Sequence, residues 1–290
     1  MTWNNFHGGI ELRAPEFRWP GGKRIAVILR VALEGWSDGH APGSGPMANP
    51  LKSGFLDLNS ISWAEYGPRR GIHHILDILA KRKVQVSVLV CGIMAERYPT
   101  IVKKIAEAGH EIVAHSYTMD VIPPYLSESE ERKNIAQTTD LLEQISGIRP
   151  NGWISPRATA STNTARLLAE AGYEWHGDYL DDDVPYGLKF GNRTIIASPA
   201  SPAVADGPTH IRHGFPPRAV LEVFEDTLES LRRHGGMAEK IDIAAHAHIF
   251  GRPEGLWVID RILEIASSAD DIWITTRGKS AAHIRNLLQT

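Results

Sequence analysis

The chain has 290 residues, of which 42% are hydrophobic and 22% are charged, close to the globular average. These values exclude a disordered chain, a coiled coil and a fibrous repeat. Lys and Arg number 31 against 34 Asp and Glu, which gives a formal net charge of −3. No long basic run occurs, so we expect neither a nucleic-acid nor an anionic-membrane partner. The single cysteine, Cys91, excludes an intrachain disulfide.

The N-terminal residues lack the basic start, apolar stretch and small-residue cleavage site of a signal peptide. No run of about 18 apolar residues occurs, as a membrane-spanning helix requires. We therefore expect a cytoplasmic protein.

Residues 1–22 are polar and rich in Gly and Pro, and we expect them to form an extended arm before one domain of residues 23–290. The β-branched run 25–32 is typical of a strand buried on both faces. Residues 35–68 hold many Gly, Pro, Ser and Asn, which predicts a long loop. We expect a second loop, without assignable chemistry, at residues 199–216.

Strands and helices then alternate along the chain. The spacing of Ile72, Ile75, Leu76 and Leu79 predicts an amphipathic helix. Ser127-x-x-Glu130 is a capping box that opens a helix ended by Gly147. The further predicted strands are 84–90, 111–115, 151–154, 173–176, 241–245 and 272–275, and the further helices are 100–108, 163–171, 217–234, 254–267 and the C-terminus, with a hairpin turn at 190–193. About seven such units in one domain predict an α/β fold with a parallel sheet, closed into a (β/α)7-type barrel.

Ionisable side chains follow several of the predicted strands. Glu34 follows the first strand, His115 ends the third, Arg157 follows the fourth, and His246 and His248 follow a late strand. Residues 178–183 add several aspartates after another strand. Active sites of parallel barrels lie at the carboxyl ends of the strands, so we expect these side chains to converge.

The same stretches resemble the polysaccharide deacetylase superfamily, and within it the branch of metal-independent allantoinases and cyclic imide hydrolases. The motifs that carry the resemblance, in chain order, are 24–34, Tyr66-Gly67-Pro68-Arg69, 111–116, 152–157, 181–186 (Asp-Asp-Asp-Val-Pro-Tyr) and His246 through Gly251-Arg252-Pro253. Together they span about residues 23–290. The resemblance implies a distorted barrel of about seven strands and a homotetramer. It also implies substrate-binding roles for Arg69 and Asp183.

The chain departs from the metal-dependent deacetylases of this superfamily at two ligand positions. Gly35 stands where the resemblance implies an aspartate, and Met119 where it implies a second histidine. Glycine has no side chain and methionine does not bind a hard divalent cation, so we favour no metal. The alternative is zinc at a rebuilt site of Glu34, His115, Asp120 and His246. A different register would make Asp38 a ligand, but Asp38 lies four residues too far along.

Amide hydrolysis without a metal needs an activated water, stabilisation of the oxyanion and a proton for the leaving nitrogen. Glu34 is the candidate general base, and His246 the candidate general acid because imidazole titrates near neutral pH. His115 is expected to polarise water or the carbonyl. Arg157 is expected to hold a substrate oxygen, or else to pair with one of the aspartates at 181–183.

The remaining candidate residues line the expected pocket. Asp120 is a weaker candidate for substrate binding. Trp153 and Tyr186 are candidate pocket walls, although core packing is the role that we favour for both. For Cys91 we favour a buried thiol over a nucleophile.

We therefore expect a hydrolase of non-peptide C–N bonds in a small cyclic or linear amide, such as a ureide, hydantoin or imide. The first alternative is an N-deacetylase of a small acetylated amino sugar. The second is a barrel that binds a ligand without catalysis.

Overall fold

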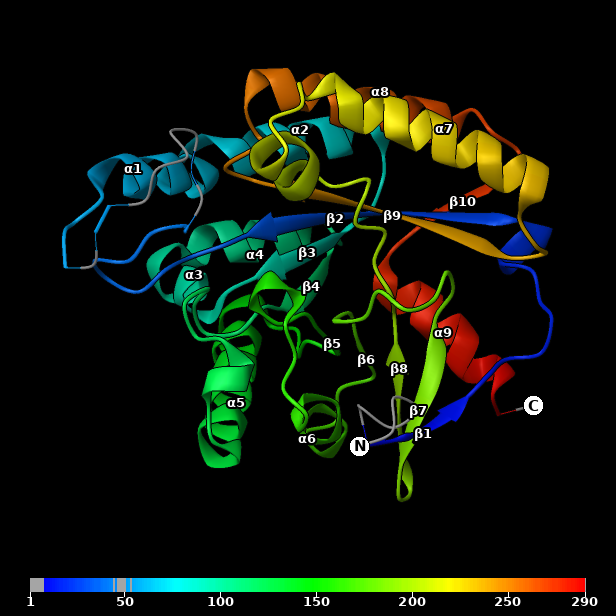
Figure 1. Ribbon diagram of the computed structural model, residues 1–290, viewed down its shortest axis with the longest axis horizontal. Coiled ribbons are helices and arrows are strands. Elements are labelled where there is room, and N and C mark those ends of the chain that lie inside the picture. The colour runs from blue at the N-terminus through cyan, green and yellow to red at the C-terminus, as the bar shows by residue number, and fades with distance from the viewer. Residues whose placement is uncertain (1–7, 44, 46–50, 53, 290) are drawn as a thin grey trace.

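The computed structural model describes residues 8–43, 45, 51, 52 and 54–289, and its centre is a curled half-barrel sheet wrapped by helices (Figure 1). The strands are β1 (Ile10–Leu12), β2 (Ile25–Leu33), β3 (Ser87–Val90), β4 (Glu111–Ala114), β5 (Gly152–Trp153), β6 (Trp175–His176), β7 (Tyr186–Phe190), β8 (Arg193–Ala197), β9 (Glu239–His246) and β10 (Ile272–Thr275). The α-helices are α1 (Leu58–Tyr66), α2 (Ile72–Arg82), α3 (Gly92–Arg97), α4 (Pro99–Glu107), α5 (Glu128–Ser146), α6 (Thr164–Glu170), α7 (Arg218–His234), α8 (Pro253–Ser267) and α9 (Arg277–Leu287). The predicted α/β barrel-type fold is confirmed.

The sheet runs in the order β1-β7-β8-β6-β5-β4-β3-β2-β10, and β9 pairs with β2. All pairs are parallel except β1 with β7 and β7 with β8, where the predicted hairpin lies. The segment after β8 then crosses to β9, since Ala205 bridges Ala244. This bridge places the segment after β8 beside β9.

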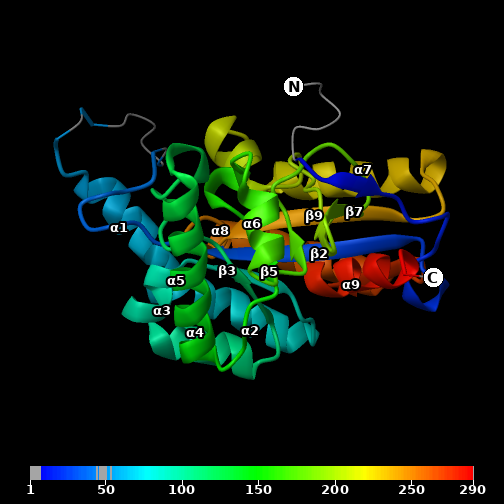
Figure 2. The same cartoon turned by 90° about the horizontal axis from the view of Figure 1, so that it is seen from below.

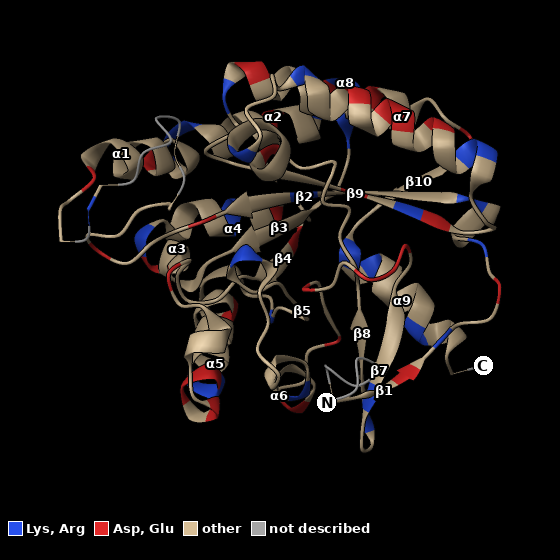
Figure 3. Ribbon diagram, in the orientation of Figure 1, with Lys and Arg blue, Asp and Glu red and all other residues tan. Residues whose placement is uncertain are grey.

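Helices cover the outer face of the sheet. Figures 1 and 2 show α2, α7 and α8 along one side of β2 and β9, while α3, α4 and α5 lie farther along the sheet. The capping box predicted at the start of α5 is present, with Ser127 and Glu130 bonded reciprocally, and Gly147 ends the helix in the left-handed conformation. Asp and Glu fill the middle of α7, and Arg residues stand at its C-terminal end, as Figure 3 shows.

Strand alternation decides which side chains enter the barrel. In β2 the odd-numbered residues Ile25 to Leu33 join the cluster beneath the helices, whereas Ala26 and Ala32 join the inner cluster. Successive side chains of a strand point to opposite faces, so Glu34, at an even position, continues the inner face. His246 stands opposite Ala32 in the parallel register with β9. The inner face thus ends in ionisable groups.

A buried ionic cluster lies on the inner faces of β2 and β9. Asp242 is fully buried and pairs with Arg30 at 2.8 Å and with Arg277 at 2.6 Å. The ammonium of Lys240 donates to the carbonyl oxygen of Pro199. Burial lowers the pKa of Lys240 to about 8 and that of Arg277 to about 10. Asp242 is therefore the carboxylate that pairs with the fully buried Arg277 guanidinium and with the partly buried one of Arg30.

Three expectations about the connecting segments need correction. Residues 35–68 are not loop throughout, because α1 begins at Leu58, where the Asp57 side chain caps the helix by accepting from the Ser60 amide. Residues 199–216 contain a π-helical turn, Gly207–Arg212. The described part of the arm is extended at β1 but is not separate from the domain, since β1 pairs with β7 of the sheet, and a 3-10 turn follows at Pro20–Gly22.

In the part of the chain that the structure describes, no helix is both long and apolar enough to cross a bilayer. Cys91 is fully buried, as expected, and its thiol donates to the His115 carbonyl oxygen at 3.2 Å. Burial raises the pKa of this thiol well above its usual value, so it is protonated at neutral pH.

Candidate active site

Three histidines surround the carboxylate of Glu34. Oε1 lies 3.5 Å from His246 Nε2 and 3.6 Å from His115 Nε2, and Oε2 lies 3.9 Å from His248 Nδ1. Glu34 is only 9% exposed, and the His246 side chain is the most exposed of the cluster at 21%. The strand-end residues Glu34, His115 and His246 therefore converge as predicted, with solvent access on the His246 side.

Asp206 holds His246 on the side away from Glu34. Its Oδ1 lies 2.5 Å from His246 Nδ1, and its Oδ2 accepts from the His246 backbone amide at 2.6 Å. Asp206 is fully buried and also caps the π-helical turn by accepting from the Gly207 amide. Burial alone would lower the pKa of His246, but the charges of Asp206 and Glu34 outweigh it and raise the pKa to about 9. At neutral pH the ring is an imidazolium that can donate a proton from Nε2.

The pKa of Glu34 falls to about 2. Burial would raise it, but the charge of His246, the hydrogen bond from His115 and the other imidazoles outweigh the burial. Glu34 is thus ionised at neutral pH in a site that excludes most water. A carboxylate with this pKa is a weak base, so its capacity to accept a proton from water rests on its being ionised at neutral pH and on its position in the site.

A backbone carbonyl group orients the His115 ring on the side away from Glu34. Its Nδ1 lies 2.5 Å from the carbonyl oxygen of Ile154, so Nδ1 carries a hydrogen and Nε2 faces Glu34. The ring is 3% exposed. His115 can therefore exchange a hydrogen bond only on the Glu34 side.

His248 forms an apolar wall of the site together with two tryptophans. Its ring packs edge to face against Trp63 at 4.6 Å and Trp36 at 5.8 Å between centroids. Burial lowers the pKa of His248 to about 4, so it is neutral at neutral pH. The site thus holds one charged and one neutral imidazole on strand β9 and the turn after it.

Most of the other predicted site residues lie outside this cluster. Arg157 is exposed, has a left-handed backbone (φ 60°) and forms no ion pair with a described carboxylate. Asp120 is half-buried, and its Oδ1 accepts from the Ser37 amide at 2.8 Å. Arg69 and Asp183 are exposed, and neither contacts Glu34 or the histidines around it within the described residues.

Trp153 and Tyr186 lie in the core, the role favoured for them from the sequence. Trp153 packs against Tyr173 and donates to the Ser155 hydroxyl at 3.0 Å. Tyr186 is fully buried and donates to Asp181 at 2.8 Å, while Arg13 stacks over its ring at 4.3 Å. The aspartates at 181 and 182 are therefore bound to Tyr186 and Arg13. Substrate roles for these residues remain predictions.

The residues present do not fit the metal site of the deacetylases. A Cβ at position 35 would lie 2.6 Å from both Ile93 Cγ2 and Met94 Sδ, so the packing leaves no room for an aspartate there. Met119 is buried and apolar. Within the described ranges, no group of three or more His, Cys, Asp or Glu side chains is arranged to hold a metal ion. Of the four residues of the alternative zinc site, Glu34, His115 and His246 lie together, whereas the Asp120 carboxylate binds the Ser37 amide, and zinc there remains a prediction.

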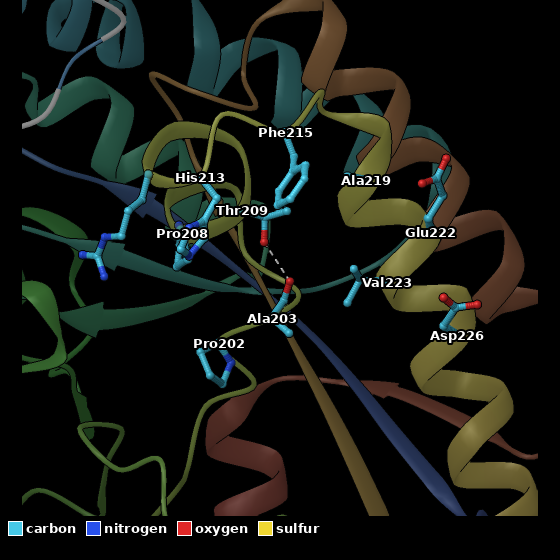
Figure 4. A pocket seen from close by; sticks show the side chains of 11 residues that line it. Pro202, Ala203, Pro208, Thr209, His213, Phe215, Ala219, Glu222, Val223 and Asp226 are labelled. Atoms are coloured by element: carbon cyan, nitrogen blue, oxygen red, sulfur yellow. Dashed lines mark hydrogen bonds between the residues drawn. The ribbon is translucent and has the colours of Figure 1, made fainter. Parts of the chain in front are cut away.

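A cavity of about 670 Å³ lies away from Glu34, between the 202–215 segment and α7 (Figure 4). Its wall on α7 carries Glu222 and Asp226, and Thr209 donates to the Ala203 carbonyl oxygen at 2.9 Å. A second cavity, of about 380 Å³, is lined by Trp63 and Arg252 and lies behind the apolar wall at His248. Neither cavity is lined by Glu34, His115 or His246.

Comparison with known proteins agrees with this fold. The sequence profile of the polysaccharide deacetylase family matches residues 64–176. The PuuE allantoinase structure superposes with a TM-score of 0.86 at 27% identity, covering 94% of each chain. A structure from Pseudomonas aeruginosa PAO1 assigned to the polysaccharide deacetylases gives 0.85 at 26% identity, covering 92% of this chain and 93% of that one. A Helicobacter pylori peptidoglycan deacetylase is 24% identical over 174 residues, 59% of this chain and 55% of its own.

The chain thus matches the polysaccharide deacetylase family in sequence over residues 64–176, and it shares its fold with these two solved structures over more than nine tenths of its length. One of them is an allantoinase, which supports the resemblance to the allantoinase-like branch.

Asp206 was not predicted as a member of the cluster, and His248 was expected near the site but was given no catalytic role. Asp206 lies in a segment without a recognisable motif and comes to His246 only through the crossing of that segment to β9. His248 follows His246 at the same parity, a signal that could have identified it.

Proposed function

We propose that this protein hydrolyses a non-peptide C–N bond in a small cyclic or linear amide, such as a ureide, hydantoin or imide. The observation that carries the proposal is the contact of ionised Glu34 with a His246 imidazolium held by Asp206. Glu34 can accept a proton and His246 can donate one, and Glu34 Oε1 lies 3.5 Å from His246 Nε2.

In the proposed reaction, a water molecule attacks the substrate carbonyl carbon and passes a proton to Glu34. The C–O bond forms as the carbonyl π electrons move to oxygen, where the His246 imidazolium faces the developing charge, and His115 Nε2 accepts a hydrogen bond that orients the water. The C–N bond then breaks as His246 gives its Nε2 proton to the leaving nitrogen. Ring opening yields a carboxyl group and a free nitrogen on the same product.

The alternative proposal, removal of an acetyl group from a small amino sugar, uses the same proton transfers. The family profile and the likeness to peptidoglycan deacetylases support it. The missing ligand side chains at positions 35 and 119 count against it, because they leave this chain without the metal site of those enzymes.

The test is a panel of cyclic ureides, hydantoins, imides and acetylated amino sugars, followed by mass spectrometry. We expect a ring compound to gain one water. We expect the same product in the presence of a chelator, because the ligand positions of the deacetylases are occupied by Gly35 and Met119. Loss of acetyl from the sugars alone would contradict the proposal in favour of deacetylation. Ligand binding without turnover across the panel would favour a non-catalytic binding barrel.

A further inference from the structure

The residue after His115 has an unusual backbone conformation. Ser116 has φ 61°, in the left-handed region that non-glycine residues seldom adopt. It is fully buried, and the chain turns sharply here, from the end of β4 toward residues 117–120. Such a conformation persists only where the surroundings hold it, and it is frequent beside active sites.

Asn134 on α5 stabilises Ser116 in this left-handed conformation. Its side-chain amide donates to Ser116 Oγ at 2.9 Å, and its Oδ1 accepts from the Tyr117 backbone amide at 3.0 Å. Asn134 is only 7% exposed, so water does not compete for these bonds. The amide therefore binds both the side chain and the following peptide of the left-handed residue.

The turn held by Asn134 is also joined to the segment that carries Glu34. The Ser116 carbonyl oxygen accepts from the Gly92 amide at 2.9 Å, and the Met119 amide donates to the Gly35 carbonyl oxygen at 2.8 Å. A shift of the turn would thus move His115 relative to Glu34, although Asn134 touches neither residue.

We propose that Asn134 is a positioning residue for the reaction: by holding Ser116 in the left-handed conformation, it sets the place of His115 against Glu34. The inference rests on the proposed function, in which His115 orients the attacking water. Misplacing a catalytic group by about 1 Å can cost about a hundredfold in rate.

The test is the variant Asn134→Ala, assayed on the best substrate of the panel. We expect kcat to fall at least tenfold and KM to change less than threefold. The matched control is Thr139→Val on the same helix, which removes a buried hydrogen bond to Tyr173 that has no link to the turn. We expect the control to keep kcat within threefold. A kcat within threefold of wild type in folded Asn134→Ala would overturn the proposal.

A second variant separates positioning from loss of fold. Ser116→Gly removes the cost of the left-handed conformation, so Asn134→Ala should lower kcat less than threefold in the Ser116→Gly background. An undiminished loss in that background would contradict the proposal.

A crystal structure of Asn134→Ala gives a readout that does not depend on turnover. We expect the His115 ring to move from its place 3.6 Å from Glu34. An unmoved ring would overturn the proposal even if the wild-type protein hydrolyses no compound of the panel. A wild-type protein without turnover whose ring does move in the variant would refute the proposed function alone.

Discussion

At the scale of single residues, the site depends on the two carboxylates that flank the His246 ring and stabilise its charged form. Glu34 faces Nε2 and Asp206 faces Nδ1, so the imidazolium lies between two negative groups. Opposite charges within a few ångströms favour the charged form of the ring. His248, two residues on, is neutral because it is buried against Trp36 and Trp63.

The raised pKa of His246 predicts how hydrolysis depends on pH. The reaction needs His246 protonated, so kcat/KM should stay level at neutral pH and fall as the pH rises through about 9. Asp206→Asn removes a charge that raises the pKa of His246, and we expect the alkaline limb to move down by about one to three pH units. The control is Asp260→Asn, a surface carboxylate paired with Arg82, which should leave the limb in place. An unchanged limb in Asp206→Asn would remove His246 as the acid.

At the scale of elements, the turn after β9 is held against the start of α2 by two glycines. A Cβ on Gly71 would lie 1.8 Å from the Ala247 carbonyl oxygen, and one on Gly251 would lie 2.1 Å from the same atom. The two backbones therefore touch where the chain carries His246 and His248. Only residues without a side chain allow this approach.

We expect Gly71→Ala to push the turn away from α2 and to displace His248. Overpacking of this kind costs about 1–3 kcal/mol of the free energy of unfolding, which chemical denaturation measures. Activity should fall as well, because His248 faces Glu34. Gly43→Ala is the matched control, since a Cβ there meets no atom within 4 Å. Equal stability and activity of the two variants would show that the close approach has no role.

The elements near the site could be predicted to different extents. Alternation along β2 and β9 predicts that Glu34 and His246 share the inner face, because strand parity is a local property. The place of Asp206 depends on a crossing between distant segments, which no local pattern encodes. The helix α1 was missed because Gly, Pro, Ser and Asn dominate the residues around it, and its 3.6-residue pattern is short.

At the scale of the whole molecule, the curled sheet has an ionic interior rather than a purely apolar one. Asp242 neutralises Arg30 and Arg277 within the barrel, and α9 supplies Arg277 from the chain's last helix. The fold class followed from the alternation of strands and helices. The buried ionic cluster could not be predicted, because the sequence does not show whether charged residues in a strand are paired.

We expect Asp242→Ala to lower the free energy of unfolding by about 3–5 kcal/mol, because two guanidinium groups would lose their buried partner. The measurement is denaturant unfolding followed by circular dichroism. Asp260→Ala, which breaks a partly exposed pair with Arg82, should cost less than about 1 kcal/mol. A similar small loss in both variants would show that the interior pairs contribute nothing beyond a surface pair.

The central claim is that Glu34 acts on the attacking water, and the most direct measurement is turnover of Glu34→Gln on the best substrate of the panel. The variant keeps the shape of the side chain and removes its charge, so we expect kcat to fall at least a hundredfold. The control is Glu65→Gln, a carboxylate bound to Tyr98 outside the site, which should retain full turnover. A loss of less than threefold in Glu34→Gln would remove Glu34 from the mechanism.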